Sequence, residues 1–308
     1  MNAELITNTN DDLMIANTAR VSFGNWKSEL DLSFRKDGKQ RDPALIDYLA
    51  REQHISPFFH VRFTMILPMQ AINLYFITDP TYLFRAVWKV LPNGTLKFRT
   101  SYYGWMRLLR DGIISPSYES GVYNALNQPS LHYANTAYDL DMYKPHPLTT
   151  DNYLFLGTED DPNFIDHSVR ITAPIPIARQ IFTHKMFDSN EISRRYVSDE
   201  PTMHLITEHR SKPEGSIKQG SGGVHPGNDL LVRMQSDYYS YTVTYYNDLI
   251  VDGVAPEQAR FYLPQAMETQ FIFTGSEVSW KRLIANRTDS HAQQEVAELA
   301  ALINALLP

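Results

Sequence analysis

The spacing of apolar residues predicts both helices and strands along this chain. In 42–54, apolar residues such as Ile46 and Leu49 follow helical spacing, whereas 60–68 begins with polar and apolar residues in alternation, which is typical of a strand. The expected strands are 4–7 and 60–68, and the expected helices are 42–54, 173–187, 229–253, 255–264, 276–287 and 289–307.

Capping residues stand where several of these helices are expected to begin. Asp42 precedes Pro43, which suits an N-cap followed by proline at the first helical position. Ser276 is the expected cap of the helix that follows it. Ser290 and Gln293 have capping-box spacing at the start of the last helix.

The segment 173–187, "APIPIARQIFTHKMF", is expected to be a helix opened by its prolines. We expect Ile177, Ile181 and Met186 to face the core. The long amphipathic helix 229–253 is expected to end near Gly253.

The segment 71–168 differs from the rest of the chain. It holds ten of the eighteen tyrosines and many turn signals, such as "LPNGT", "NQPS" and "KPHPLTT". Its own apolar stretches, "YLFRAVWKVL" and "WMRLL", indicate an ordered subdomain rather than a linker.

Composition narrows the classes of partner. The chain has 308 residues, 43% hydrophobic and 20% charged, which is enough for a sizeable core in one large or two small domains. The formal net charge of -7 repels nucleic acid and anionic membranes, so neither is an expected partner. An anionic ligand would therefore need a local basic cluster.

The chain contains no cysteine, which excludes disulfides, thiolate metal sites and cysteine nucleophiles, and fits an intracellular protein. The N-terminus lacks a basic start followed by an apolar core, so no signal peptide is expected. The chain has no run of 18 apolar residues, so no membrane span is expected.

One basic stretch stands out against this acidic background: "HKMFDSNEISRRY", 184–196. Arg194 and Arg195 offer guanidinium forks and Ser193 offers a hydroxyl, as an anion requires. The same residues also suit a solvated turn in which the arginines pair with a nearby carboxylate such as Asp199. Both interpretations stay open from this stretch alone.

Other candidates are less specific. Arg287 suits either a ligand near a positive helix end or the carbonyls that end its own helix. The glycine-rich 218–227 lacks the Lys-Ser/Thr of a P-loop and is expected to be a flexible loop. The ten histidines form no H-E-x-x-H motif, so no metal site is expected, and no G-x-S-x-G motif supports a serine hydrolase.

Five stretches, in order, resemble the flavin-dependent thymidylate synthases: "ARVSF" at 19–23, "HISPFFH" at 54–60, "ARQIFTHKMFDSNEISRRY" at 178–196, "ARFYLPQ" at 259–265 and "NRTDSHAQQE" at 286–295. The second resembles the family's H-x-[ST]-P-F-x-H, and the third its R-H-R followed by N-E-x-S-x-R-Y. The last two resemble A-R-x-x-L-P and L-R-x-x-x-x-A-Q-x-E. By this resemblance 71–168 is an insertion that compact members lack.

The resemblance implies an α/β (α+β) fold with a mixed sheet flanked by long helices and an inserted subdomain. It implies a catalytic domain formed by 1–70 and 169–308, an insertion subdomain of unknown role at 71–168, and a homotetramer with shared sites. The implied reaction is FAD-dependent methylation of dUMP at C5 to dTMP, with methylenetetrahydrofolate as carbon donor and NADPH as reductant. Hydride delivery from a reduced flavin needs no cysteine nucleophile, which this chain lacks.

The matching positions imply roles for individual residues. Arg287 matches the catalytic arginine that polarises the pyrimidine. The residues that match dUMP-binding positions are Gln180, Glu191, Ser193, Arg195, Arg260 and Arg287. The residues that match FAD-binding positions are His54, Ser56, Thr183, His184, Lys185, Glu191, Arg282 and His291, with His54 and His291 also candidates for the folate side.

The flavin side departs from the family pattern. The R-H-R triplet is Thr183-His184-Lys185 here, and we hypothesise that Arg282 replaces a lost arginine. Two alternatives follow from this departure: altered C5 chemistry such as dUMP hydroxymethylation, or a non-catalytic nucleotide-binding protein that uses the tyrosine-rich insertion as a partner surface. A cytoplasmic location is expected, in a bacterium or in a host cell if the source is viral.

Overall fold

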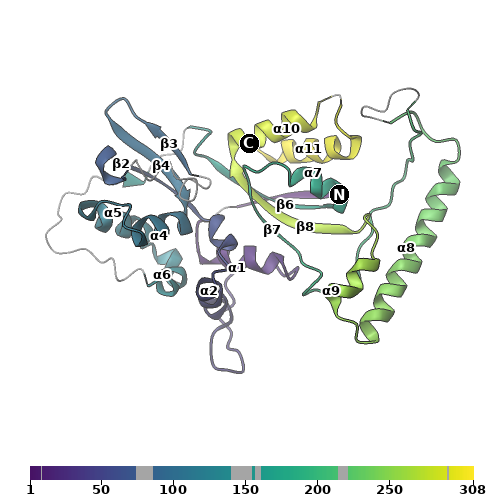
Figure 1. Cartoon of the computed structure of the whole chain (residues 1–308), viewed down its shortest axis with the longest axis horizontal. Helices are drawn as coiled ribbons and strands as arrows, with labels where there is room; N and C mark the ends of the chain where they lie inside the picture. Colours follow the sequence, from purple (N-terminus) through teal and green to yellow (C-terminus); the bar gives the residue numbers. More distant parts are fainter. Residues whose placement is uncertain (8, 74–85, 140–154, 157–160, 214–220, 290) are drawn as a thin grey trace. The chain divides into compact units, whose positions relative to one another are not determined.

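The computed structural model describes residues 1–7, 9–73, 86–139, 155–156, 161–213, 221–289 and 291–308 (Figure 1). The chain divides into two compact units, which are described separately. The C-terminal unit consists of Met1–Ile6, Val21–Gly24 and His167–Pro308, and the N-terminal unit of Thr7–Arg20 and Asn25–Asp166.

The C-terminal unit is built on a four-stranded sheet with the order β1-β6-β8-β7. The strands are β1 (Asn2–Ile6), β6 (Asp166–Pro174), β8 (Glu268–Ser276) and β7 (Asp188–Glu191). The strand expected at 4–7 is confirmed as the edge strand β1, shifted by one or two residues.

The expected α/β class is confirmed, but the expected mixed character of the sheet is wrong for the strand pairs that are described. β1 pairs with β6 and β7 with β8, both antiparallel. Between β6 and β8, Ser168 bonds to Thr274 across 2.7 Å, and Gln270 donates to Thr172 across 3.3 Å. Along β6 the residue numbers rise from 168 to 172, while those of their β8 partners fall from 274 to 270. This pair of strands is therefore also antiparallel.

Three helices cover this sheet, α7 (Ile175–Ile181), α10 (Glu277–Arg287) and α11 (Gln294–Leu306), all beside the same strands in Figure 1. Val169 and Ile171 of β6 and Phe271 of β8 are wholly buried in a core cluster with side chains of these helices. The helix contributions to that cluster are Ile177, Ala178, Ile181, Trp280, Leu283, Val296, Leu299 and Ile303.

The helix expected at 173–187 is only partly confirmed, because α7 has seven residues. Ile177 and Ile181 face the core as expected, but Met186 does not, since it is 37% exposed. Phe187 explains the early end. Its ring is buried against Phe273 and Trp280, with centroids 5.0 and 4.5 Å away, so the chain must turn back toward the sheet after Ile181.

Of the two predicted helix caps near the C-terminus, one is confirmed and one is not. Ser276 caps α10 as predicted, because its Oγ accepts the backbone N–H of Ser279 at 3.2 Å. The capping box at Ser290 and Gln293 is wrong. Gln293 is itself the N-cap of α11, and Ser290 lies outside the described residues.

The long helix α8 spans Asn228–Val251, and Gly253 follows it with φ +85, as its glycine signal predicted. The helix expected at 255–264 is divided into α9 (Pro256–Ala259) and the 3-10 turn η5 (Arg260–Tyr262). The glycine-rich 218–227 lies partly outside the described residues.

The N-terminal unit holds a second sheet, with the order β3-β4-β2-β5 and antiparallel pairs throughout. Its strands are β2 (Arg62–Pro68), β3 (Val87–Val90), β4 (Thr95–Ser101) and β5 (Phe155–Leu156). Its helices and 3-10 turns are α1 (Asp12–Val21), α2 (Arg41–Arg51), η1 (Ser56–Phe59), η2 (Met69–Ala71), α4 (Tyr102–Arg110), α5 (Pro116–Leu126), η3 (Pro129–Leu131) and α6 (His132–Ala137). The strand expected at 60–68 is confirmed as β2.

Asp42 is not the N-cap of α2, contrary to the prediction. Gln40 occupies that position, and Asp42 lies inside the first turn, where it is 2% exposed. The Asp42 carboxylate pairs with the guanidinium of Arg20 and accepts the backbone N–H of Asp31. Burial beside an arginine explains its position better than capping does.

β2 lies before the predicted boundary at residue 70, and β4 lies after it, yet they pair over the whole of β2, from Arg62 with Ser101 to Pro68 with Thr95. The compact units therefore divide the chain elsewhere, and a separate role for 71–168 stays a prediction. Among the described helices, none combines the length and hydropathy that crossing a membrane requires.

Candidate functional site

Arg287, the last residue of α10, is held by three acceptors from the end of α7 and the turn that follows it. Its Nε donates to Nε2 of His184 at 2.9 Å. Its Nη2 donates to the carbonyl oxygen of Gln180 and to Oγ1 of Thr183, each at 2.8 Å. A guanidinium carries five N–H donors, so the two on Nη1 are left without a partner in the described chain. The predicted roles, with Gln180 and Arg287 for dUMP and Thr183 and His184 for FAD, stay predictions.

Thr183 has a defined hydroxyl orientation in this cluster. Its Oγ1 donates to the carbonyl oxygen of Gln180 at 2.7 Å, so its hydrogen is already used and only a lone pair faces Arg287. A threonine at this family arginine position therefore supports the guanidinium of Arg287 instead of adding a second cation.

His184 is held as a neutral imidazole. Its Nε2 accepts from Arg287, which requires the tautomer with the proton on Nδ1. Burial lowers the pKa of His184, and the charges of Arg287 and Arg282 lower it further. The role of Arg282 as a replacement for a lost arginine stays a hypothesis.

The side chain of Gln180 continues the cluster toward α11. Its Nε2 donates to Oε1 of Gln293 at 2.6 Å. Gln293 was not among the predicted site residues, although it lies in the "AQQE" portion of a family-like block. Its position in that block was the only signal available before the structure.

Glu191, at the end of β7, forms a second group. Its Oε1 accepts from Oγ1 of Thr269 at 2.6 Å, and its carbonyl oxygen accepts from Oγ of Ser22 at 3.0 Å. Burial raises the pKa of Glu191, against the opposing effects of the Thr269 hydrogen bond and of Arg179. The backbone N–H of Ser193 donates to the carbonyl of Ser22 at 3.0 Å, which ties "ARVSF" to the basic stretch.

The two adjacent arginines of that stretch differ. Arg194 is buried and its Nη1 donates to Oδ1 of Asp199 at 2.8 Å, so it matches the structural interpretation. Arg195 is exposed, and its guanidinium lies 5.1 Å from the ring centroid of Tyr196. Arg195 is therefore the arginine that remains accessible to an anion.

The remaining predicted residues are not joined to Arg287 by any described hydrogen bond or ion pair. Arg260 is exposed and its Nε donates to the carbonyl of Glu257, one turn back, at 3.3 Å. Lys185 and His291 are exposed. His54 and Ser56 belong to the N-terminal unit, so their relation to the Arg287 cluster is not described.

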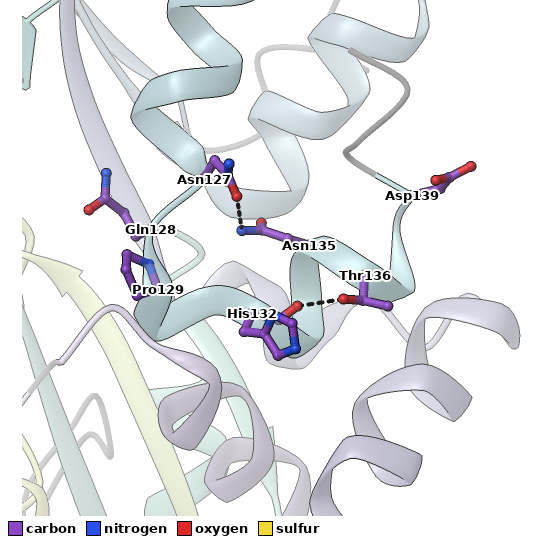
Figure 2. A pocket seen from close by; sticks show the side chains of 7 residues that line it. All are labelled: Asn127, Gln128, Pro129, His132, Asn135, Thr136 and Asp139. Atoms are coloured by element: carbon purple, nitrogen blue, oxygen red, sulfur yellow. Dashed lines mark hydrogen bonds between the residues drawn. The ribbon is translucent and has the colours of Figure 1, made fainter. Parts of the chain in front are cut away.

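The N-terminal unit contains a cavity of about 360 Å³ between the end of α5 and α6 (Figure 2). Its wall is polar, and the side chains of Asn127, Asn135 and Thr136 are hydrogen-bonded within it. Nδ2 of Asn135 donates to Oδ1 of Asn127 at 3.3 Å, and Oγ1 of Thr136 donates to the carbonyl of His132 at 2.8 Å. None of the predicted site residues lines it.

Comparison with known proteins identifies the family. The model of the "Thymidylate synthase complementing protein" family matches residues 4–70 and 163–307. A flavin-dependent thymidylate synthase of Aquifex aeolicus is 26% identical over 96% of this chain and 94% of its own length. One from Thermosipho africanus is 33% identical, over 47% of this chain and 64% of its own length.

Among solved structures, a UMP/dUMP methylase from Streptomyces cacaoi bound with 5-Br dUMP aligns with a TM-score of 0.42 and 16% identity. The alignment covers 99% of this chain and 88% of the other. A likeness this low adds nothing to the family match. The family model matches the chain on both sides of residues 71–162. This chain therefore belongs to the thymidylate synthase complementing family, the flavin-dependent thymidylate synthases, and is an enzyme of that class.

Proposed function

We propose that this enzyme methylates dUMP at C5 to give dTMP, with FAD as cofactor, methylenetetrahydrofolate as carbon donor and NADPH as reductant. The observation that carries the proposal is the fixed guanidinium of Arg287. Three protein acceptors orient it, and its Nη1 donors stay available for a ligand. The family supports the reaction class, and Arg287 supplies a chemical reason for the substrate.

The role of Arg287 is electrostatic. C5 of uracil becomes nucleophilic when negative charge builds up on the pyrimidine ring, and a cation fixed beside the ring stabilises that charge. Since the chain has no cysteine, covalent attack on the ring by a thiolate is excluded. Activation by Arg287 needs no such attack.

For the phosphate of dUMP we propose Ser193, Arg195 and Arg260. Both arginines are exposed, and neither forms a salt bridge with a described carboxylate. Charge-assisted donors of this kind are the usual partners of a phosphate. Gln180 and Glu191 are the remaining proposed contacts to the nucleotide.

The residues proposed for FAD fit an anionic, diphosphate-bearing cofactor. Lys185 and Arg282 are exposed cations, and they would hold the cofactor together with Thr183, His184 and His291. His54 and Ser56 stay proposed FAD contacts because they match family positions. When bound, FAD supplies the hydride that reduces the transferred one-carbon group.

We also propose a homotetramer with sites shared between subunits. The surface of α8 supports self-association, because an apolar stripe on it is left uncovered. Met234, Tyr238, Tyr241 and Tyr245 are 57, 54, 69 and 39% exposed, at spacings of four, three and four residues. That spacing matches one face of a helix that packs against another helix.

A mass measurement tests the reaction. Purified protein, loaded with FAD, is incubated with dUMP, methylenetetrahydrofolate and NADPH, and the molecular mass of the nucleotide product is measured by mass spectrometry. We expect dTMP. Arg287→Ala should abolish turnover, whereas Lys281→Ala, a charge removal on the same helix, should not. An Arg287→Ala variant that turns over as fast as the parent would contradict the role of Arg287.

The same assay separates the alternatives. A product heavier than dTMP by one oxygen atom would indicate hydroxymethylation. A colourless protein that takes up no FAD and yields no product would indicate a nucleotide-binding protein without catalysis. These alternatives are kept because Thr183 stands where the family has an arginine. Its hydroxyl binds Arg287 and supplies no positive charge for the flavin.

A further inference from the structure

A row of side chains runs from Arg210 to the proposed nucleotide site within the C-terminal unit. The guanidinium of Arg210 pairs with the carboxylate of Glu295. Oε2 of Glu295 accepts from Nε2 of Gln293 at 2.9 Å. Oε1 of Gln293 in turn accepts from Nε2 of Gln180 at 2.6 Å.

The negative charge of Glu295 fixes which way each hydrogen bond in this row points. Glu295 is half-buried, and burial alone would raise its pKa. The hydrogen bonds from Arg210, from its own backbone N–H and from Gln293 outweigh burial, so its pKa is lowered and it is ionised at neutral pH. An ionised carboxylate only accepts hydrogen bonds.

The ionised carboxylate of Glu295 sets the orientation of the Gln293 carboxamide, which in turn sets that of Gln180. A carboxamide has a donor end and an acceptor end. Because Glu295 only accepts, Gln293 must turn its donor Nε2 toward Glu295 and its acceptor Oε1 toward Gln180. Gln180 must then turn its own Nε2 toward Gln293. Its carbonyl Oε1 is left without a partner in the described part of the chain.

We infer that Arg210, Glu295 and Gln293 are positioning residues that make Gln180 present an acceptor, Oε1, to the nucleotide. This inference rests on the proposed function, in which Gln180 contacts dUMP. The matching group on the ligand is a hydrogen-bond donor. In dUMP the donors are N3–H of the uracil and the 3′-hydroxyl of the sugar.

The location of Gln180 supports this assignment. Its backbone carbonyl accepts from Nη2 of Arg287, so the two residues are in direct contact. Arg287 offers donors on Nη1 while Gln180 offers an acceptor. A ligand bound at these two residues would meet donors from Arg287 and an acceptor from Gln180, whereas a reversed Gln180 carboxamide would offer a second donor instead.

Binding measurements on the FAD-loaded protein test the inference with three probes: dUMP, 3-methyl-dUMP, which lacks N3–H, and 2′,3′-dideoxy-UMP, which lacks the 3′-hydroxyl. We expect the parent to bind one of the two analogues about tenfold more weakly than dUMP, as one lost hydrogen bond requires. The analogue that is rejected identifies the donor that Gln180 accepts.

Glu295→Gln and Gln293→Leu each release the orientation of Gln180. In both variants we expect the rejected analogue to bind within about twofold of dUMP. Glu277→Gln is the control, since it makes the same change at a carboxylate of α10 that pairs with Lys281 and has no described bond to this row. It should keep the discrimination of the parent.

The outcomes are distinguishable. A parent that fails to bind dUMP contradicts the proposed function itself. A parent that binds all three probes equally, or a Glu295→Gln variant that discriminates like the parent while still binding dUMP, overturns the inference and leaves the proposed function intact.

Discussion

Nε of Arg287 donates to Nε2 of His184 across 2.9 Å, a hydrogen bond between residues 103 positions apart. The bond can form only while His184 is neutral, because a protonated imidazole has no lone pair to accept with. The orientation of the proposed catalytic arginine is therefore linked to the protonation of a histidine.

Acidification should weaken dUMP binding through His184. The pKa of His184 is lowered from 6.5, so protonation begins below that value in the folded protein. Between the lowered pKa and 6.5, the unfolded chain binds more protons than the folded one, so the free energy of unfolding rises with pH in this window. We expect the dissociation constant of dUMP to rise as the pH falls below 6.5.

His184→Gln provides the control for that pH dependence. The carboxamide oxygen of glutamine accepts from Arg287 without titrating. The variant should lose the part of the pH dependence that comes from His184 and keep the part that comes from the phosphate of dUMP, whose second pKa is about 6. An acid limb that persists unchanged in His184→Gln would assign the titration to another group.

Thr183 should matter for its hydroxyl and not for its size. Thr183→Val keeps the volume but removes the acceptor for Nη2 of Arg287. We expect the dissociation constant of dUMP to rise about tenfold, as the loss of a charge-assisted hydrogen bond requires. Isothermal calorimetry with dUMP measures this change.

Thr183→Ser restores the hydroxyl and should bind dUMP like the parent. Thr288→Val is a second control, since it removes the hydroxyl next to Arg287 in the sequence, one that donates to the carbonyl of Ile284 instead. Equal losses in Thr183→Val and Thr183→Ser would mean that packing, and not the hydrogen bond, holds Arg287.

The apolar stripe of α8 should control self-association. Burying Met234 and Tyr241 against another subunit removes apolar surface from water, and a carboxylate at both positions opposes that burial. We expect the parent to have four chain masses by light scattering, and the Met234→Glu, Tyr241→Glu double variant to have fewer.

Ser236→Glu adds the same charge to an exposed position of α8 that is outside the stripe, and it should leave the mass unchanged. A double variant that keeps the mass of the parent would show that the stripe is not an interface between subunits.

Asp12 should give the N-terminal unit a pH-dependent stability. Its oxygens accept the backbone N–H groups of Tyr133 and Ala134 at 2.8 and 2.9 Å. Burial outweighs these bonds and raises the pKa of Asp12 from 3.8 to about 6. Between these values the folded chain holds the extra proton, so this contribution to the free energy of unfolding falls as the pH rises.

The slope from one such proton is at most about 1.4 kcal/mol per pH unit. Asp12→Asn should remove that part of the pH dependence in urea unfolding, whereas Asp47→Asn, at an exposed carboxylate, should not. A parent and an Asp12→Asn variant with parallel stability curves from about pH 4 to 6 would contradict the assignment.

The sequence alone determined the features that depend on neighbouring residues. The cap at Ser276, the glycine after α8 and the alternation of β2 are local, so each could be recognised from a few adjacent letters. The family motifs likewise identified the candidate site residues, because their order and spacing are written in the chain.

Only the tertiary structure decided the features that depend on distant partners. α7 ends early because Phe187 is buried against Trp280, and Asp42 lies inside a helix because Arg20 pairs with it. The sequence showed Thr183 only as a missing arginine, whereas the fold brings its hydroxyl to Arg287, 104 residues away. Such pairings depend on which surfaces pack together, and local spacing carries no record of that.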